Sequence, residues 1–392
     1  MITGLGAVSA YGLGADELWR GILAGRSCVA PAAPALEDLP AIPAIPASAI
    51  AAFSARDVLG KGLRGVCRES QLLLAATLFA RRDAGLADSP VAREGRDGVV
   101  ARDAEGVFAG TRWAGLEDYL HFHLERSIWG PEKVSPTRGP NTGFNAPASH
   151  VSIRYDLQGP NLTFASRTSA SLDAIGHAAD WIRKQRVKIV YAGGIESLSY
   201  PRVRHLLASG QPIAEAARPF DARRTGATPG EGAVIVVLED AEHARARGAR
   251  ILAEVGAWAM AFEPAQPDRA ARRVLRAAGP ADAIFGAGSG DRALDAWEAA
   301  AIAADHAEVP VCAVKGAAGE WEGASGALQV LAASRALADG VVPPTAGFER
   351  LDPELPAIRV SGAARAGRLG SVAVVTLHGS GRASALALRA AP

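Results

Sequence analysis

The stretch GPNLTFASRTSASLDAIGHAADWIRKQRVKIVYAGGIES, residues 159–197, is typical of a strand, a helix and a second strand in close succession. Residues 162–166 and 188–192 predict the two strands, because both are short and mostly apolar. Between them, residues 169–184 place Leu172, Ile175 and Ile182 on one face of a helix. A unit of this kind favours a layered α/β fold.

The same alternation continues on both sides of this stretch. A charged link at residues 240–249 separates two runs of strands and helices. The Pro-rich residues 29–48 predict a surface excursion, and residues 130–149 predict a long loop. The other expected strands are residues 1–8, 233–239, 251–255, 283–285 and a pair within 364–388, and the other expected helices are residues 16–24, 70–84, 269–278, 294–304 and 324–338.

Composition excludes several classes of protein. Apolar residues make up 49% of the 392 residues and charged residues 21%, so we expect a large buried core. The net charge of +1 argues against a nucleic-acid binder. Cys28, Cys67 and Cys312 lie far apart and predict no disulfide framework, which favours a reducing cytoplasm. No apolar run reaches membrane-spanning length, and the N-terminus is not typical of a signal peptide.

Four segments, in order along the chain, resemble the β-ketoacyl synthase family. These are residues 2–27 (ITGLGAVSAYGLGADELWRGILAGRS), residues 159–197, residues 218–239 (RPFDARRTGATPGEGAVIVVLE), and residues 286–302 together with 313–327. The resemblance implies the thiolase-like α/β fold, a duplicated five-layer αβαβα arrangement. It also implies two ketosynthase-like halves, residues 1–240 and 250–392.

The family's catalytic Cys-His-His set is missing from the matching positions. Counting from the segments that align best, the cysteine position is Thr168 and the two histidine positions are Ala287 and Glu320. No histidine occurs between His243 and His306, or between His306 and His378.

A threonine hydroxyl is a poor nucleophile without an adjacent base, alanine has no donor, and an ionised glutamate repels a developing enolate. We therefore expect no condensing activity from this chain alone. By contrast, Asp295, Glu298 and Lys315 match positions that support the family's fold.

A preserved scaffold without its reactive groups resembles the chain length factor, or ketosynthase β subunit, of type II polyketide synthases. The resemblance implies a heterodimer with an active ketosynthase α subunit, an acyl carrier protein that presents the acyl chain, and a role in shaping the tunnel for that chain. The glutamine common at the old cysteine position is Thr168 here. An aromatic-polyketide system and a reducing system that makes polyenes both stay open.

Two other functions stay open. One is a stand-alone thiolase-fold acyltransferase or hydrolase that uses Glu320, Thr168 or Ser169. The other is a purely structural pseudoenzyme. The short loop of residues 378–382 (HGSGR) matches the family's glycine-rich closing loop weakly, which predicts that its gating role is lost.

Residues 110–124 (GTRWAGLEDYLHFHL) predict a partly apolar helix. We hypothesise that Trp113, Leu116 and Leu120 set the length of the tunnel, and an interface or core helix is an equal alternative. His121 and His123 face different directions on a helix. We therefore expect no metal site and no cofactor.

Two further motifs are weak signals. Gly4 and Gly12 each begin a short glycine pair that does not complete a dinucleotide-binding loop. Arg218, Arg223 and Arg224 predict a structural ion-pair site, with docking of an acidic carrier protein as the alternative.

Overall fold

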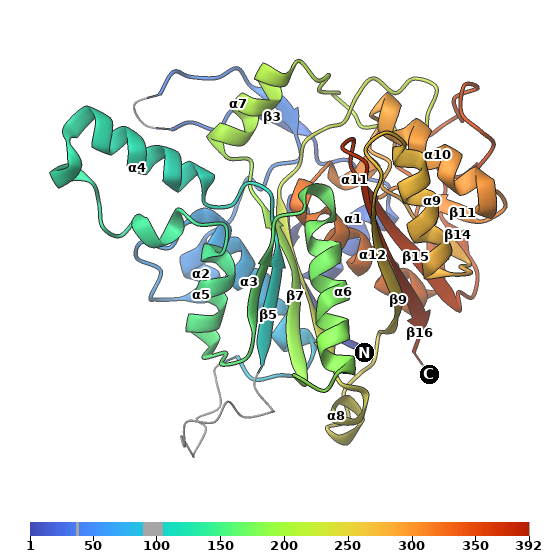
Figure 1. Ribbon diagram of the computed structural model, residues 1–392, viewed down its shortest axis with the longest axis horizontal. Helices are drawn as coiled ribbons and strands as arrows, with labels where there is room; N and C mark the ends of the chain where they lie inside the picture. Colours follow the sequence, from blue (N-terminus) through green and yellow to red (C-terminus); the bar gives the residue numbers. More distant parts are fainter. Residues whose placement is uncertain (37–38, 89–104, 392) are drawn as a thin grey trace.

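The computed structural model describes residues 1–36, 39–88 and 105–391, and it shows a large mixed sheet covered by helices (Figure 1). The strands are β1 (Ile2–Ser9), β2 (Gly12–Leu13), β3 (Ala30–Ala32), β4 (Ile45–Ala47), β5 (Gly106–Gly110), β6 (Asn161–Phe164), β7 (Ile189–Glu196), β8 (Gly232–Glu239), β9 (Ala253–Phe262), β10 (Ala283–Phe285), β11 (Pro310–Cys312), β12 (Val341–Val342), β13 (Arg359–Val360), β14 (Arg365–Ala366), β15 (Ser371–Leu377) and β16 (Arg382–Ala390).

Helices fill the links between these strands. The α-helices are α1 (Ala15–Leu23), α2 (Ala55–Leu59), α3 (Arg68–Asp83), α4 (Leu116–Trp129), α5 (Ala146–Tyr155), α6 (Ala170–Arg183), α7 (Tyr200–Ser209), α8 (Ala241–Ala246), α9 (Pro267–Ala278), α10 (Arg292–His306), α11 (Lys315–Ala318) and α12 (Ser325–Asp339). Short 3₁₀ turns are η1 (Pro131–Lys133), η2 (Gly139–Asn141), η3 (Arg167–Ser169) and η4 (Glu322–Ala324).

The order of the strands repeats in the two halves of the chain. In the described residues the main sheet runs β13-β11-β10-β15-β16-β9-β1-β8-β7-β5-β6, with β2 beside β1. β1, β8 and β7 pair antiparallel in turn, and β7, β5 and β6 then pair parallel. β9, β16, β15, β10 and β11 follow the same pattern of directions. Within the sheet of the described residues, the two half-sheets join where β1 pairs with β9, at Ile2↔Ala253. The topology is therefore duplicated, and the exact limits at residues 240 and 250 stay a prediction.

Three buried clusters divide the molecule into five layers. The central cluster packs α6 and α12 between the inner faces of the two half-sheets. A second cluster packs α3 and α5 against the outer face of the first half-sheet. A third packs α9 and α10 against the outer face of the second. This arrangement confirms the expected αβαβα layering, and it buries the start of α6 in the middle of the molecule.

The structure corrects several predicted boundaries. The strand expected at residues 188–192 continues to Glu196 as β7. A pair of glycines is typical of a turn, but here it lies inside the strand and lets the neighbouring backbone of β8 come close. A Cβ on Gly193 would lie 1.9 Å from the carbonyl oxygen of Val234. Residues 130–149 are also not one loop, since two 3₁₀ turns and the start of α5 lie within them.

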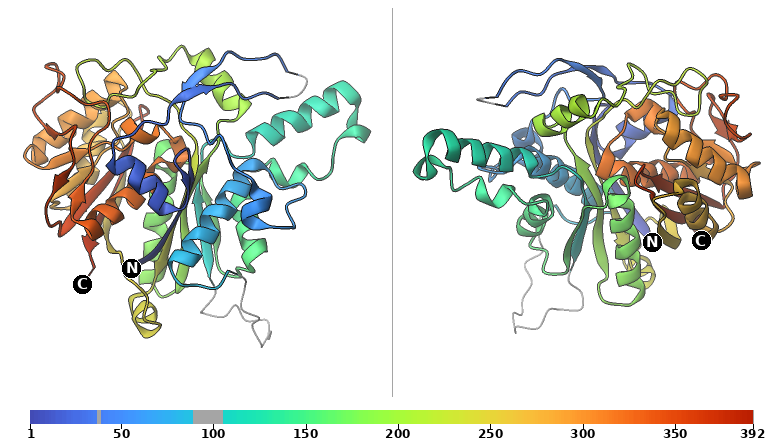
Figure 2. Two further views of the ribbon diagram at one scale, coloured as in Figure 1. Left: turned by 180° about the vertical axis from the view of Figure 1, so that it is seen from behind. Right: turned by 45° about the horizontal axis from the view of Figure 1, so that its top comes forward.

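One helix stands apart from the layered body. α4 projects sideways with its return segment and forms an arm in both views of Figure 2. Along this arm Tyr119, Ile128, Trp129 and Phe144 are exposed. Within the described residues, no helix has both the length and the apolar character needed to cross a membrane.

Candidate functional site

A cavity of about 480 Å³ lies at the start of α6. Its wall is formed by Arg112, by the turn before α6, by the end of α7 and the segment that follows, by the start of α10, by the loop before α12, and by the loop after β15. The 3₁₀ turn η3 directly precedes the N-terminus of α6, and it brings Thr168 into the cavity wall. A helix N-terminus carries partial positive charge, which is the electrostatic setting in which a thiolate would be stabilised.

Thr168 itself is held inside the protein. It is 4% exposed, and its Oγ1 donates a hydrogen bond of 3.1 Å to the backbone carbonyl of Leu377. The next residue, Ser169, is fully buried and accepts a hydrogen bond from Thr376 Oγ1 at 2.9 Å. Both hydroxyl groups at this turn are therefore tied to β15.

Glu320 also lines the cavity, and its carboxylate has three partners. Lys315 Nζ lies 2.7 Å from Oε2, while the backbone N–H of Glu322 and the hydroxyl of Ser325 donate to Oε1 at 2.8 and 2.5 Å. Lys315 is almost fully buried and donates as well to the carbonyl oxygen of Ala287, at 3.0 Å. The carboxylate is thus part of the cavity's framework.

The third predicted position, Ala287, is fully buried and does not line the cavity, although Ser289 two residues later does. The backbone N–H of Ala287 donates to Glu298 Oε1 at 2.6 Å. The structure therefore brings Thr168 and Glu320 to one cavity and places Ala287 behind its wall, where Lys315 connects it to Glu320.

Asp295 and Glu298 support the backbone of the same loop from α10. Asp295 accepts hydrogen bonds from the backbone N–H groups of Phe220 at 2.7 Å, Ser289 at 2.9 Å and Gly290 at 3.3 Å. Burial raises the pKa of Asp295 to about 6. Burial, helped by the nearby charge of Asp295, raises the pKa of Glu298 to about 8.

Two histidines that the sequence reasoning missed also line the cavity. His378 comes from the loop after β15, and His205 comes from α7. A search for histidines at the two aligned positions could not find them, because His205 and His378 lie on elements other than those that carry these positions. The only available signal was that His378 begins the glycine-rich segment 378–382, inside the region predicted to hold a pair of strands.

The imidazole of His378 is neutral at pH 7. Burial, with smaller effects from Arg112 and Arg167, lowers its pKa to about 4. Its Nδ1 accepts the backbone N–H of Ser380 at 3.0 Å, so the ring proton is on Nε2. This nitrogen can donate a hydrogen bond, but it cannot take a proton from a neighbouring hydroxyl.

The residues predicted to set tunnel length lie beside the cavity and not in its lining. The ring of Trp113 is 5.0 Å from that of His205, which lines the cavity, and the guanidinium of Arg112 is 5.0 Å from the centre of the same Trp113 ring. Leu116 and Leu120 are half-buried on α4, and Leu120 packs against the cluster around Leu198 and Tyr200. Their tunnel role stays a prediction.

The basic cluster predicted from residues 218–224 contains structural ion pairs. Buried Arg224 pairs with Asp352, and its Nε lies 3.8 Å from Asp295 Oδ2. Arg223 pairs with Asp221 at 2.9 Å and with Glu349 at 2.8 Å. These contacts connect the loop before β8 to the segment after β12.

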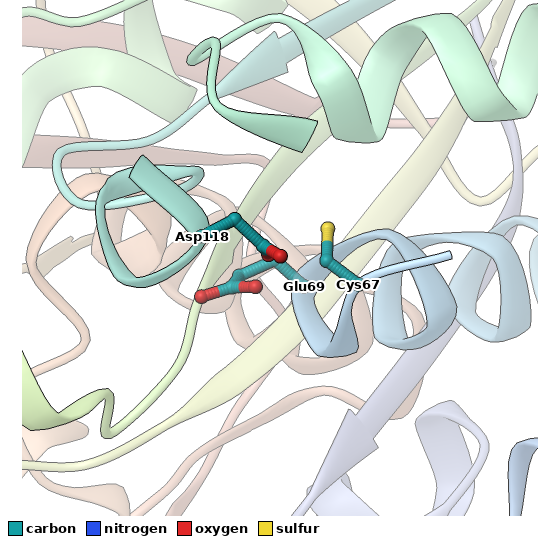
Figure 3. A group of neighbouring side chains, drawn as sticks. All are labelled: Cys67, Glu69 and Asp118. Atoms are coloured by element: carbon teal, nitrogen blue, oxygen red, sulfur yellow. The ribbon is translucent and has the colours of Figure 1, made fainter. Parts of the chain in front are cut away.

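The described part of the chain holds one group of three possible metal ligands, Cys67, Glu69 and Asp118 (Figure 3). Cys67 and Asp118 also line a second cavity. The ligand atoms of the three residues lie within 4.8 Å of one another. Each group has a partner in the protein, respectively Ser70, Ser197 and Arg138. Burial raises the pKa of Cys67 to about 12, which disfavours the thiolate that a metal requires.

Comparisons with known proteins place the chain in a family. The model of the β-ketoacyl synthase N-terminal domain matches residues 1–244, and the model of the C-terminal domain matches residues 244–349. The chain belongs to the β-ketoacyl synthase family, and its fold is the thiolase-like α/β fold of ketosynthases.

Its relatives include both synthases and subunits of polyketide systems. The 3-oxoacyl-(acyl-carrier-protein) synthase 2 of Coxiella burnetii is 32% identical, with 90% of this chain and 89% of the relative covered. The tetracenomycin polyketide synthase ketoacyl synthase beta subunit of Streptomyces glaucescens is 31% identical, with 99% of this chain and 98% of the relative covered. The solved ishigamide ketosynthase/chain length factor has a TM-score of 0.88 at 26% identity and covers 100% of this chain and 98% of its own.

Proposed function

We propose that this chain is a catalytically inactive ketosynthase-like subunit, a chain length factor, that pairs with an active ketosynthase and shapes the tunnel for a growing polyketide or polyene chain. The observation that carries the proposal is the state of the family's reactive positions. Thr168 donates to a backbone carbonyl, Glu320 is bound by Lys315 and Ser325, and Ala287 has no functional group.

The chemistry of the cavity supports an inactive site. A nucleophilic hydroxyl needs a base within hydrogen-bond reach. His378 directly follows β15, the strand whose Leu377 carbonyl accepts the hydrogen bond of Thr168. Its Nδ1 already accepts the N–H of Ser380 and its Nε2 carries the proton, so the imidazole has no free nitrogen to act as a base. The lost groups of a ketosynthase act as a unit, so the condensation that they carry out together is lost with them.

The relatives favour a subunit over a separate enzyme. The tetracenomycin relative is named a beta subunit, and the similar solved structure is named a ketosynthase/chain length factor. Each is covered almost from end to end. By analogy, the partner of this chain is an active ketosynthase α subunit, and an acyl carrier protein brings the acyl chain to the pair in the cytoplasm.

Two surfaces fit a large partner. β6 is the last strand of the main sheet in the described residues, so one of its edges faces outward. The arm around α4 carries exposed Tyr119, Ile128, Trp129 and Phe144. Several exposed large apolar side chains on one projecting segment favour an interaction site there.

Co-expression with an affinity-tagged candidate ketosynthase tests the pairing. We expect a one-to-one complex, and we expect Trp129→Glu to weaken co-purification strongly because Trp129 is 58% exposed on the arm. Phe262→Glu is the matched control, since Phe262 is 61% exposed on β9, far from α4 in Figure 1. A stable homodimer that condenses malonyl-carrier protein unaided would overturn the proposal.

The tunnel role has its own test in the reconstituted pair. Trp113→Ala should lengthen the products, because the ring fills space beside His205 at the cavity wall. Phe262→Ala serves as the control that should leave the product profile unchanged. Unchanged products with Trp113→Ala would show that Trp113 does not set product length, and would favour a purely structural subunit.

The stand-alone acyltransferase or hydrolase makes a different prediction. Such an enzyme would show a burst of acylation with an activated thioester, abolished by Thr168→Ala or Ser169→Ala. We expect no burst, because both hydroxyl groups are held in hydrogen bonds to β15.

A further inference from the structure

Glu196 is a buried carboxylate behind the cavity wall to which the proposed function has so far given no role. It is the last residue of β7 and is fully buried. Its Oε1 accepts hydrogen bonds from the hydroxyl of Thr111 at 2.6 Å and from the backbone N–H groups of Arg112 and Trp113, both at 3.0 Å. Its Oε2 accepts from the N–H of Gly323 at 3.3 Å. Hydrogen bonds to an ionised acceptor are stronger than those between neutral groups, so this carboxylate holds its neighbours firmly.

The donors belong to two segments beside the cavity, residues 111–113 and 322–323, which we call the two wall segments. Arg112 and Glu322 line the cavity and pair with each other at 2.6 Å. The backbones of the two segments are in contact, because a Cβ on Gly323 would lie 2.5 Å from the carbonyl carbon of Thr111. Glu322 has φ 47°, a conformation that few residues other than glycine adopt. Glu196 therefore joins two segments, one of which has a strained backbone.

The position of the Trp113 ring depends on this backbone. The ring lies 5.0 Å from that of His205 at the cavity wall, and the guanidinium of Arg112 lies 5.0 Å from the ring centre. The indole Nε1 of Trp113 is buried and has no hydrogen-bond acceptor among the described residues. The indole therefore has no directional bond of its own, and the hydrogen bond from its backbone N–H to Glu196 fixes the point from which the ring projects.

The charge of Glu196 changes in a range of pH that experiments can reach. Burial raises the pKa of this carboxyl to about 7, while the charge of Arg202 and the hydrogen bonds from the first wall segment oppose the rise. The other charged side chains around the end of β7 are Arg112 and Glu322, which pair with each other, Glu231, which pairs with Arg68, and Glu69 on α3. A protonated carboxyl oxygen donates a hydrogen bond, so the group can no longer accept from every N–H that points at it.

We propose that Glu196 is a positioning residue for the acyl tunnel, whose carboxylate holds Trp113 and the loop of Glu322 in the arrangement that limits the length of the chain. The inference rests on the proposed function and deepens it, because it assigns the control of length to a buried residue that touches no acyl chain. Trp113 limits the length by the volume of its ring, and Glu196 acts through Trp113.

Hydrogen exchange of the full chain at pH 8, in the assembly in which it purifies, tests whether Glu196 holds the two wall segments. Glu196→Gln keeps the size of the side chain and removes its charge. We expect the backbone amides of both segments to exchange about tenfold faster or more, as for lost hydrogen bonds to a charged acceptor. Thr111→Val removes one donor and leaves the charge, so it should give a smaller rise in the same segments. This second variant decides the question even where Glu196→Gln purifies poorly.

Glu239→Gln is the matched control. Glu239 is also a fully buried glutamate at the end of a strand, β8, and it also accepts a threonine hydroxyl, that of Thr3 at 2.8 Å. Because β7 and β8 are antiparallel, Glu239 lies opposite Ile189, at the other end of the sheet from Glu196. This variant should leave exchange in the two wall segments unchanged.

The reconstituted pair with a ketosynthase tests the control of length. Glu196→Gln should give longer products than the wild type at pH 8, and Glu239→Gln should give the same products as the wild type. The double variant of Trp113→Ala with Glu196→Gln should give the products of Trp113→Ala alone, because Glu196 acts through Trp113. Wild-type products should lengthen as the pH falls from 8 to 6, and the products of Glu196→Gln should not.

Each part of the inference has a result that would overturn it. Unchanged exchange in the two wall segments of Glu196→Gln would show that Glu196 does not hold them. Faster exchange with unchanged products, in a pair that still forms, would remove Glu196 from the control of length. Longer products from the double variant than from Trp113→Ala would rule out the route through Trp113. Equal pH profiles of the wild type and Glu196→Gln would rule out a role for the charge.

The failure of this inference and the failure of the proposed function are distinguishable. Exchange is measured on this chain without a ketosynthase, so it decides whether Glu196 holds the two wall segments even where no pair forms. Absence of a pair with a ketosynthase would overturn the proposed function and, with it, the control of length.

Discussion

The cavity wall and the layer directly behind it differ in what their polar groups do. Behind the wall, Asp295 and Glu298 accept backbone N–H groups, and Lys315 bridges Ala287 and Glu320. On the wall, the side chain of Thr168, which we predict to stand at the family's cysteine position, makes a single hydrogen bond. The buried layer therefore holds the loops in place whether or not chemistry occurs. The presence of this buried layer is therefore evidence for the fold and does not indicate catalysis.

The largest expected effect comes from the buried layer. Asp295→Ala should destabilise the protein by about 4 kcal/mol, because it leaves backbone N–H groups unpaired and removes the carboxylate that lies 3.8 Å from buried Arg224. Urea unfolding measures the change. Asp57→Ala is the control, since Asp57 is exposed and should cost no more than about 0.5 kcal/mol. Equal stability of the two variants would break the comparison.

Lys315→Met should destabilise by about 3 kcal/mol, since it leaves the carboxylate of Glu320 without its cation in a largely buried site. The double variant Lys315→Met with Glu320→Gln should recover part of this loss, because no uncompensated charge is left. Chemical unfolding of the two single variants and the double variant gives the coupling. Additive losses would show that the pair is not a unit.

Glu298 predicts how stability depends on pH. Its folded pKa of about 8 lies above the ordinary value of 4.5, so between these values the folded state binds more protons than the unfolded state. Stability should therefore fall as pH rises from about 5 to 8, by up to about 1.4 kcal/mol per pH unit from this group. Glu298→Gln should flatten this slope between pH 6 and 8 in unfolding measurements. An unchanged slope would mean that Glu298 is ionised in the folded protein.

The smallest effect belongs to the cavity wall. Thr168→Ala removes one hydrogen bond of 3.1 Å and should cost about 1 kcal/mol. Products of the reconstituted pair should not change. Thr168→Cys restores the family's residue type but should give no condensation, because the aligned histidine positions stay Ala287 and Glu320. Activity in the cysteine variant would show that His378 or His205 replaces the missing imidazoles.

Much of the fold could be predicted from periodicity. The helix on residues 169–184 is α6, Ala170–Arg183, because Leu172 and Ile175 face the central core at helical spacing. Strand ends were harder, since Gly193 and Gly194 are typical of turns and lie inside β7. A glycine's close approach to a neighbouring backbone is a property of the packed layers, and no local pattern records it.

The candidate site was only partly predictable for the same reason. Counting from aligned segments singled out Thr168 and Glu320, and the structure brings both residues to one cavity. The same count missed His378, which reaches that cavity from the far end of the chain. It also could not indicate that Lys315 would join Ala287 to Glu320, because such a bridge depends on how α11 is oriented.

Turnover of malonyl-carrier protein tests the central claim most directly. The chain is purified with a partner ketosynthase whose own catalytic cysteine and both catalytic histidines have been replaced, and release of carbon dioxide and formation of condensed product are measured. The account predicts that both stay at the background seen without protein. Turnover above background that disappears with Thr168→Ala or His378→Phe would contradict it.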